Sequence, residues 1–442
     1  MNPDDLHEFA QVLFDDAPTP LAGQGPAGWG PVDGRDVCLA VAGAASEVRV
    51  RALAARTGRP LVTVFAGDDA DHDGGAADLR VLGALARDSA ALSGVVPQIA
   101  VVLTTADREA ALLLPLADLA VAVRGARSAL ADPAAAETVT GTARSAGDLG
   151  GADLHAEVTG RFAHVAEDAA EAARFVRDVL AHLPSNNRAT APRLPDAGPD
   201  PAEDDPELAG LLPTEPGAPY DVREVVARLA DDDLVELHTA HAPHVVTAFA
   251  RIDGWSTGVV ATQPAVRGGA LDAAAAGKAA RFVRWCDAFG VPVLTLVDTA
   301  GAVPAGEDDE GAPTAALARL LYAYAEATVG LVTVLTGRAH GPARLALGSG
   351  HVGADLVLAW PRARTGERDE FAAAARASAA DDWRALVREA AAAAEPVEAV
   401  RRGDVDAVVD PGTTRTHLAA ALRLLHRKTG QQPARRHGNV PL

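Results

Sequence analysis

The chain is poor in cysteine, lysine and aromatic residues. Its 442 residues include two cysteines, Cys38 and Cys286, two lysines, Lys278 and Lys428, and only 4% Phe, Trp and Tyr. Two isolated cysteines form neither a disulfide framework nor a CxxC pair, which fits a reducing compartment. With so few aromatic rings, we expect the hydrophobic cores to be built from Val, Leu and Ala.

The chain also lacks positive charge and long apolar runs. Its 40 basic and 60 acidic residues give a formal net charge of −20, which disfavours binding to nucleic acids and anionic membranes. The start, residues 1–5, lacks the basic residues of a signal peptide. The longest apolar run, residues 110–123, is broken by Asp118 and is too short to span a bilayer. These features predict a soluble, cytoplasmic protein with no nucleic-acid or membrane partner.

A proline-rich acidic segment divides the sequence. Residues 189–219 hold eight of the 29 prolines, with seven Asp or Glu and one Arg. This composition predicts an extended, solvated linker. We therefore expect an N-terminal domain over residues 1–188 and a C-terminal domain over residues 220–442, which is within the usual range of domain sizes.

The two halves resemble one another. The matching segments are 58–66 with 290–298, 96–103 with 329–336, and 117–123 with 354–360. Because these apolar segments match in the same order, the sequence indicates an internal duplication.

Each half alternates helical and strand patterns. We expect helices over 46–57 and 79–93 in the first half, and over 273–289 and 314–328 in the second. Alternation at this spacing predicts parallel strands joined by right-handed crossovers. A strand that leads into a helix presents backbone N–H groups with no partner inside the helix. One such turn in each half is therefore a candidate position for stabilising a negatively charged oxygen.

Many motifs follow one another in an order typical of a known family. In the second half they include KAARFVRWCDAFGVPVLTLVDTAG (278–301), GRAHG (337–341) and GADLVLAWP (353–361). In the first half they include ETVTG (137–141) and DLGG (148–151). From about Ala42 onward the chain resembles the β (carboxyltransferase) subunit of biotin-dependent acyl-CoA carboxylases of the propionyl-CoA and acetyl-CoA type. The family's usual long N-terminal segment is missing, so the resemblance predicts a first domain truncated at its start.

The resemblance implies a fold and a reaction. The fold is α/β, with two crotonase-like domains of the ClpP/crotonase superfamily in tandem, each a spiral of ββα units. The assembly is a hexamer, with active sites where the first domain of one subunit faces the second domain of another. The reaction transfers CO₂ from carboxybiotin to the α-carbon of a short acyl-CoA. Carboxybiotin arrives on a biotin carboxylase or biotin carrier subunit, so we expect no covalently bound cofactor and no metal.

The first-half turn departs from the family. The family's Gly-Gly-Ala falls on Arg108, Glu109 and Ala110, preceded by Asp107. The resemblance assigns the backbone N–H groups of Glu109 and Ala110 to the enolate side, and Asp107 and Arg108 to substrate binding. Carboxylates at positions 107 and 109 would repel a developing enolate, and the added bulk narrows the approach. Alternatively, Asp107 is simply a helix N-cap.

The second-half turn departs as well. Here the family's motif falls on Gly341, Pro342 and Ala343, and the resemblance assigns the N–H groups of Gly341 and Ala343 to the biotin side. Pro342 has no N–H, so one donor is lost, although proline is well tolerated in the first turn of a helix. We assign the flanking His340 and Arg344, with Pro342, to substrate binding. His340 could act as an acid or base, and Arg344 could bind an anion or pair with a nearby acid.

Two further motifs carry little weight. His238, His241 and His244 form an HxxHxxH pattern, but Pro243 interrupts any helix that would gather them around a metal. GQGPAG (23–28) matches a nucleotide-binding glycine pattern without a preceding strand, so we expect a plain loop.

Three functions remain open. The first is a carboxyltransferase with weakened activity. The second is a catalytically silent paralogue that assembles with an intact carboxyltransferase or a biotin-carrying subunit in a homo- or hetero-hexamer. The third is a malonyl-thioester decarboxylase of crotonase type, which needs only one oxyanion site. Further departures from the family at residues 66–75 and 362–377 favour the silent paralogue.

Overall fold

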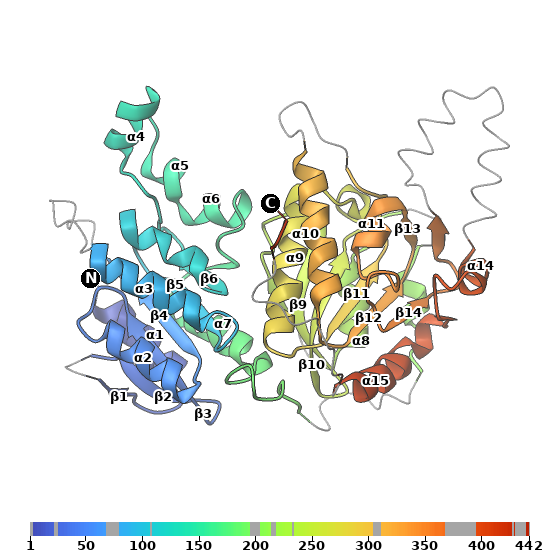
Figure 1. Cartoon of the computed structure of the whole chain (residues 1–442), viewed down its shortest axis with the longest axis horizontal. Helices are drawn as coiled ribbons and strands as arrows, with labels where there is room; N and C mark the ends of the chain where they lie inside the picture. Colours follow the sequence, from blue (N-terminus) through green and yellow to red (C-terminus); the bar gives the residue numbers. More distant parts are fainter. Residues whose placement is uncertain are drawn as a thin grey trace. The chain divides into compact units, whose positions relative to one another are not determined.

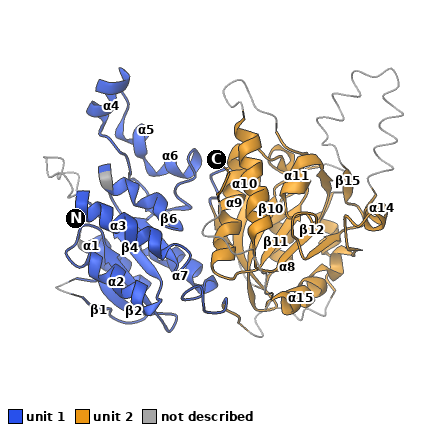
Figure 2. Ribbon diagram, in the orientation of Figure 1, with its two compact units in different colours: residues 1–191, 238–241 blue, residues 192–237, 242–442 orange. Residues whose placement is uncertain are grey.

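The computed structural model divides the chain into two compact units. Unit 1 comprises residues 1–191 and 238–241, and unit 2 comprises residues 192–237 and 242–442 (Figure 2). The structure describes residues 3–21, 25–67, 79–106, 108–194, 204–213, 218–231, 234–303, 311–366, 395–426, 428 and 439–441.

Unit 1 is built on a seven-stranded sheet in the order β1-β2-β3-β4-β5-β6-β7. Its strands are β1 (Thr19–Pro20), β2 (Gly28–Val32), β3 (Arg35–Val41), β4 (Leu61–Phe65), β5 (Gln98–Val102), β6 (Leu119–Val123) and β7 (His164–Ala166). Strands β1 to β3 are antiparallel, and β3 to β7 are parallel. Its helices are α1 (Pro3–Leu13), α2 (Glu47–Thr57), α3 (Leu79–Leu92), η2 (Arg108–Leu112), η3 (Leu114–Leu116), α4 (Pro133–Thr140), α5 (Ala146–Gly150), α6 (Ala152–Glu157) and α7 (Ala169–His182) (Figure 1).

Unit 2 repeats this plan with the order β16-β14-β12-β11-β10-β9-β8, and a separate parallel pair joins β13 to β15. Its strands are β8 (Val235–Leu237), β9 (Val245–Ile252), β10 (Trp255–Thr262), β11 (Val293–Val297), β12 (Leu331–Leu335), β13 (Arg338–His340), β14 (Leu356–Ala359), β15 (Arg364–Gly366) and β16 (Ala407–Val408). Its helices are η4 (Leu208–Leu211), α8 (Val222–Leu229), η5 (Arg267–Gly269), α9 (Ala273–Ala288), α10 (Ala312–Glu326), α11 (Gly341–Ala346), α14 (Pro396–Arg401), η6 (Pro411–Thr413) and α15 (Thr414–Leu425).

The strand register confirms the duplication. Leu61 pairs with Gln98 in unit 1 as Val293 pairs with Leu331 in unit 2. Ile99 lies opposite Leu119 as Val332 lies opposite Leu356. Because a slip of one residue would turn every side chain to the other face, equal registers show that the two sheets are built alike. The four expected helices are confirmed as α2, α3, α9 and α10, within two residues at each end.

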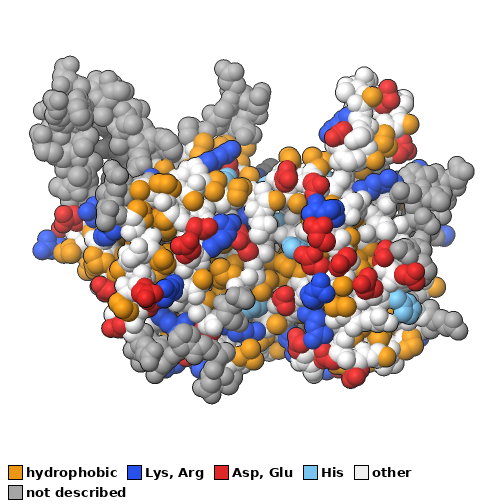
Figure 3. Space-filling model, turned by 180° about the vertical axis from the view of Figure 1, so that it is seen from behind, with side chains coloured by type: hydrophobic (Ala, Val, Ile, Leu, Met, Phe, Trp, Pro, Cys, Tyr) orange, Lys and Arg blue, Asp and Glu red, His pale blue; other side chains and the backbone are white. Residues whose placement is uncertain are grey.

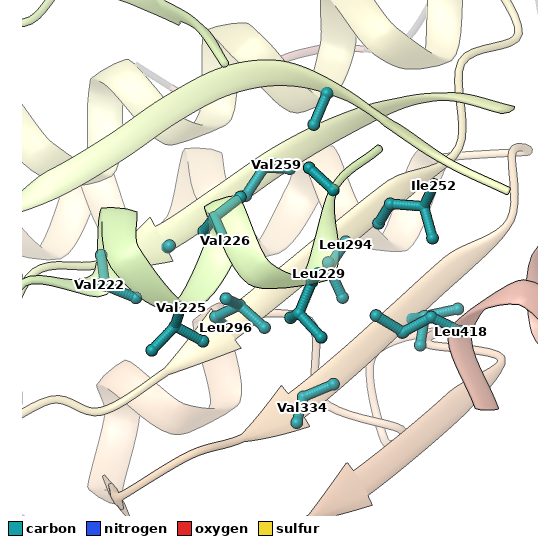
Figure 4. Packing of buried hydrophobic residues seen from close by; sticks show 14 of the residues in the cluster. Val222, Val225, Val226, Leu229, Ile252, Val259, Leu294, Leu296, Val334 and Leu418 are labelled. Carbon is teal, nitrogen blue, oxygen red and sulfur yellow. The ribbon is translucent and has the colours of Figure 1, made fainter. Parts of the chain in front are cut away.

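The core of unit 2 shows how an aromatic-poor chain packs. On α8, the apolar side chains of Val222, Val225, Val226 and Leu229 recur at the spacing of one helix face, and all four are buried. They lie against branched side chains of β9, β10, β11 and β12, and Leu418 of α15 joins the same cluster (Figure 4).

Part of the expected linker differs from the prediction of a solvated segment. Within residues 204–213, η4 turns back onto unit 2, and Leu208 is 1% exposed in the core beside α8. The segment is rich in Pro and Asp, and this composition predicts a solvated chain. The leucines of η4 nevertheless stabilise the fold more when they are buried than when they are exposed to water. Residues 195–203 and 214–217 of the same segment lie outside the described residues.

Three further sequence expectations concern surface charge, membrane spans and the segments that depart from the family. Acidic and basic side chains lie interspersed over the face shown in Figure 3. In the described ranges, no helix is both long and apolar enough to cross a membrane. Of the segments at 66–75 and 362–377 that depart from the family, residues 68–75 and 367–377 lie outside the described residues.

Candidate functional site

The second-half turn follows the carboxyl end of β12. Strand β13 leads directly into α11, where His340 is extended and Gly341 adopts a left-handed conformation with φ 58°. Pro342 lies in the first turn of α11, where its missing N–H disturbs no helical hydrogen bond. Ala343 is buried beneath it. The expected strand-to-helix turn is therefore present.

Asp298 fixes the strand that enters this turn. Its buried carboxylate follows β11, and Oδ1 accepts from the Nε and backbone N–H of Arg338 at 2.8 and 3.1 Å. Arg338 Nη2 also donates to the carbonyl of Gly268 at 3.2 Å. The sequence places Asp298 and Arg338 in two separate family motifs but gives no sign that they pair, because the two lie 40 residues apart.

A tyrosine and a glycine complete this buried cluster. The hydroxyl of Tyr220 lies 3.0 Å from Thr336 Oγ1, and burial raises the pKa of the phenol. Gly337 tolerates no side chain, because a Cβ there would lie 2.2 Å from Asp298 Oδ2. The hydrogen bonds of Tyr220 and Asp298 therefore fix the strand that enters the turn, and they leave no room for a side chain at Gly337.

Arg344 extends from α11 toward acidic partners. Its side chain is 14% exposed, and Nη2 donates to the carbonyl of Asp404 at 3.3 Å and lies 3.8 Å from the carboxylate. His351 and Arg402 approach the same carboxylate at 2.9 and 3.0 Å. Of the two roles expected for Arg344, the structure contains the pairing with a nearby acid.

The first-half turn shares two backbone features with the second. The bridge between Thr105 and Arg127 corresponds to the β13–β15 pair, and Arg108 has φ 57°, almost the value of Gly341. The N–H of Arg108 donates to the carbonyl of Ala129 at 2.6 Å. Asp107 and the side chain of Glu109 lie outside the described residues.

The segment after the first turn differs from the expected α-helix. The backbone of Glu109 and Ala110 lies in η2, a 3₁₀ helix, and a second short one, η3, contains Pro115. Proline lacks an N–H and disfavours the helical conformation of the residue before it, so it prevents a continuous α-helix here. Residues 108–116 thus form two 3₁₀ helices in place of an α-helix, and the N-cap role of Asp107 stays a prediction.

The left-handed residue in the first turn gives a testable difference. Non-glycine residues at such angles cost about 1–2 kcal/mol, while the exposed contact of Arg108 with Asp132 at 3.9 Å contributes little. We expect Arg108→Gly to raise the free energy of unfolding by about 1 kcal/mol, and Gly341→Ala to lower it similarly. Urea denaturation of both variants measures this, and a lower midpoint for Arg108→Gly would contradict it.

The three histidines do not come together on a helix. The N–H of His238 donates to the carbonyl of Ala163 in unit 1, where His241 Nδ1 also lies 3.0 Å from the carbonyl of Glu157. His244 belongs to unit 2, and its Nε2 lies 3.0 Å from Asp272 Oδ1. Within the described ranges, no three metal-ligating side chains gather.

Lys278 is a buried cation that sequence reasoning missed. It lies on α9 at 7% exposure, and its Nζ donates to the carbonyl of Val245 at 2.7 Å. Burial lowers the pKa of this ammonium from 10.5 to about 7. Only its position on the inner face of an alanine-rich helix could have indicated burial.

The depressed pKa of Lys278 predicts a pH-dependent stability. Between about pH 7 and pH 10.5 the unfolded chain binds a proton that the folded chain does not, so stability rises with pH. We expect a slope of up to about 1.4 kcal/mol per pH unit near pH 8.5. Unfolding at pH 7.5 to 9 should lose this contribution in Lys278→Met and keep it in Lys428→Met; equal slopes in both variants would contradict the assignment.

Comparisons with known proteins agree over almost the whole chain. Residues 26–440 match the model of the carboxyl transferase domain family. The propionyl-CoA carboxylase beta chain of Saccharopolyspora erythraea is 38% identical, covering 97% of this chain and 85% of that protein. The biotin-dependent acetyl-/propionyl-coenzyme A carboxylase beta5 subunit of Mycobacterium tuberculosis is 37% identical, covering 94% and 82%.

A solved structure gives the same result. A crystal structure of transcarboxylase 12S, described as a hexamer assembly with hydrolysed methylmalonyl-coenzyme A bound, superposes with a TM-score of 0.88. It is 32% identical and covers 99% of this chain and 93% of that one.

Proposed function

We propose, from the premise that this chain belongs to the carboxyl transferase domain family, that it transfers CO₂ from carboxybiotin to the α-carbon of a short acyl-CoA with weakened activity. The expected fold is confirmed, because the transcarboxylase 12S structure matches nearly the whole chain and both units carry the same sheet. The family relationship is to the β subunits of acyl-CoA carboxylases. Carboxybiotin and acyl-CoA would both be substrates rather than resident cofactors.

The observation that carries the proposal is the equivalence of the two turns. Arg108 and Gly341 have almost the same positive φ, 57° and 58°, at matching places in the two sheets. Two turns suit a reaction with two developing negative oxygens, the thioester enolate and the urea oxygen of biotin. On this assignment the N–H groups of Glu109 and Ala110 face the enolate, and those of Gly341 and Ala343 face biotin.

The side chains beside the two turns would change the rate of the reaction without taking part in its bond-making steps. Asp107, Arg108 and Glu109 bring two negative charges and one positive charge to the enolate side. Pro342 removes one amide donor from the biotin side, where His340 and Arg344 lie on either side of it. We therefore place the loss of activity mainly in transition-state stabilisation and not in folding.

We propose a partner and an assembly of the same kind. A biotin carboxylase or biotin carrier subunit would deliver carboxybiotin, and a hexamer would bring the two kinds of turn together. Transcarboxylase 12S, the solved relative, is described as a hexamer. An intact carboxyltransferase paralogue in a hetero-hexamer is the alternative, which the loss of the amide donor at Pro342 favours.

One set of measurements separates the functions. Calorimetry with propionyl-CoA and malonyl-CoA should show binding, and transfer from a carboxybiotinylated carrier should be detectable but slow. Binding without transfer or decarboxylation would overturn the enzymatic readings and leave the silent paralogue. Release of CO₂ from malonyl-CoA without a biotinylated partner would instead identify a decarboxylase.

A further inference from the structure

Arg161 in unit 1 is a half-buried arginine that no carboxylate of the described residues contacts. It lies between α6 and β7, and Nη1 is 3.5 Å from Ser128 Oγ and 3.4 Å from His155 Nε2. Burial lowers the pKa of the guanidinium, with no carboxylate opposing the shift. Among the described residues, no acidic side chain forms an ion pair with it.

The groups beside Nη1 do not neutralise Arg161. Ser128 and His155 are buried, and His155 Nε2 lies 2.7 Å from the carbonyl of Ser128. At that distance Nε2 carries a proton and donates, so it offers no lone pair to the guanidinium. Burial also lowers the pKa of the His155 imidazole, which keeps the ring neutral. Within the described ranges, the charge of Arg161 thus has no carboxylate beside it to compensate it.

Two other arginines of this chain show what the edge of a guanidinium formed by Nε and Nη2 binds. Arg124 uses Nε and Nη2 to contact both oxygens of Glu167 at 2.7 and 2.6 Å. Arg223 uses the same two nitrogens on Glu236 at 2.7 and 2.9 Å. In Arg161 these two nitrogens make no contact of this kind with the described residues, so the fork that fits a carboxylate is open.

The location of Arg161 connects it to the first turn. Ser128 follows Arg127, which bridges to Thr105 beyond the carboxyl ends of β5 and β6. Ala129, the next residue, accepts the N–H of Arg108. In parallel α/β sheets, ligands bind at this edge. Arg161 Nη1 therefore contacts Ser128, which lies between two residues bonded to the turn assigned above to the thioester.

We propose that Arg161 binds the carboxylate of a malonyl-type acyl thioester through Nε and Nη2, and so selects carboxylated over uncarboxylated acyl groups. This rests on the proposed function, whose product carries such a carboxylate on the α-carbon. The phosphates of coenzyme A offer similar oxyanions, but they belong equally to both classes of thioester and would give no selection.

The test compares malonyl-CoA with acetyl-CoA by calorimetry, since both carry the same phosphates. The parent should bind malonyl-CoA at least about tenfold more tightly, as a charge-assisted bidentate contact provides. Arg161→Gln should reduce this ratio below about twofold, and Arg161→Lys should keep part of it. Arg124→Gln, which removes an arginine already paired with Glu167, should leave the ratio unchanged.

The other possible results of this experiment would contradict either the carboxylate site or the proposed function. An unchanged ratio in Arg161→Gln, or no preference in the parent, would overturn the proposal. Equal weakening of both thioesters would assign Arg161 to the phosphates instead and would overturn it as well. The ratio needs no turnover, so a parent that discriminates but transfers no CO₂ contradicts only the proposed function. If neither thioester binds, free malonate titrated against phosphate should still distinguish parent from Arg161→Gln, and equal responses would refute the carboxylate site.

Discussion

Glycine at positions 108, 109 and 342 together should raise carboxyl transfer by at least about tenfold. One preorganised amide donor at a developing oxyanion is worth about 3 kcal/mol, or a factor of 10² to 10³ in rate. Pro342→Gly restores a backbone N–H to the first turn of α11. Arg108→Gly and Glu109→Gly remove bulk and a carboxylate from the enolate side, and glycine suits the left-handed angle at position 108.

Single variants should locate the gain. Pro342→Ala restores the donor without the flexibility of glycine, so it isolates the amide from any loosening of the turn. Pro396→Ala is the matched control, because Pro396 also lies in the first turn of a short helix, α14, and is not among the residues assigned to either turn. Transfer is measured from a carboxybiotinylated carrier to propionyl-CoA. A triple variant that transfers no faster than the parent would show that the turns do not limit activity.

The order of elements could be predicted from the sequence, and most of their contacts could not. Buried strands and helices follow from runs of Val, Leu and Ala, and the two halves support each other because their patterns repeat. Asp298 and Arg338 meet across 40 residues, and Lys278 reaches a carbonyl 33 residues away. Such pairs depend on crossovers that bring strand ends together, which local patterns do not encode.

At the first turn, the sequence could not predict the backbone conformation. Its alignment with the second turn places Arg108 on a glycine, but only the backbone angle shows that arginine adopts the glycine conformation. The 3₁₀ helices after it depend on Pro115, whose effect competes with the helix-favouring alanines and leucines around it. Arg161 was missed because an isolated arginine in sequence gives no sign of whether an acid will pair with it.

Removing the Arg415 guanidinium should lower the free energy of unfolding of unit 2 by about 3–5 kcal/mol, because it leaves a buried carboxylate unpaired. Arg415 on α15 pairs with Asp231, whose side chain is fully buried, and Nη1 donates to the carbonyls of Leu229 and Ala230 at 2.9 and 3.0 Å. Asp231 in turn accepts the N–H of Gly254 at 2.6 Å. The pair therefore ties α15 to the end of α8 and to the β9–β10 turn.

The matched control for Arg415→Ala is Arg423→Ala on the same helix, whose exposed side chain lies 3.9 Å from Asp253 and should change stability by less than about 0.5 kcal/mol. Of the four tryptophans in the described ranges, three belong to unit 2, namely Trp255, Trp285 and Trp360, so tryptophan fluorescence in urea mainly follows this unit. A double variant, Arg415→Met with Asp231→Leu, removes both charges and should recover much of the loss, because no unpaired charge then remains in the core. Equal midpoints for Arg415→Ala and Arg423→Ala would mean that apolar packing of α15, with Leu418 and Leu422 in the core, holds this helix in place without the ion pair.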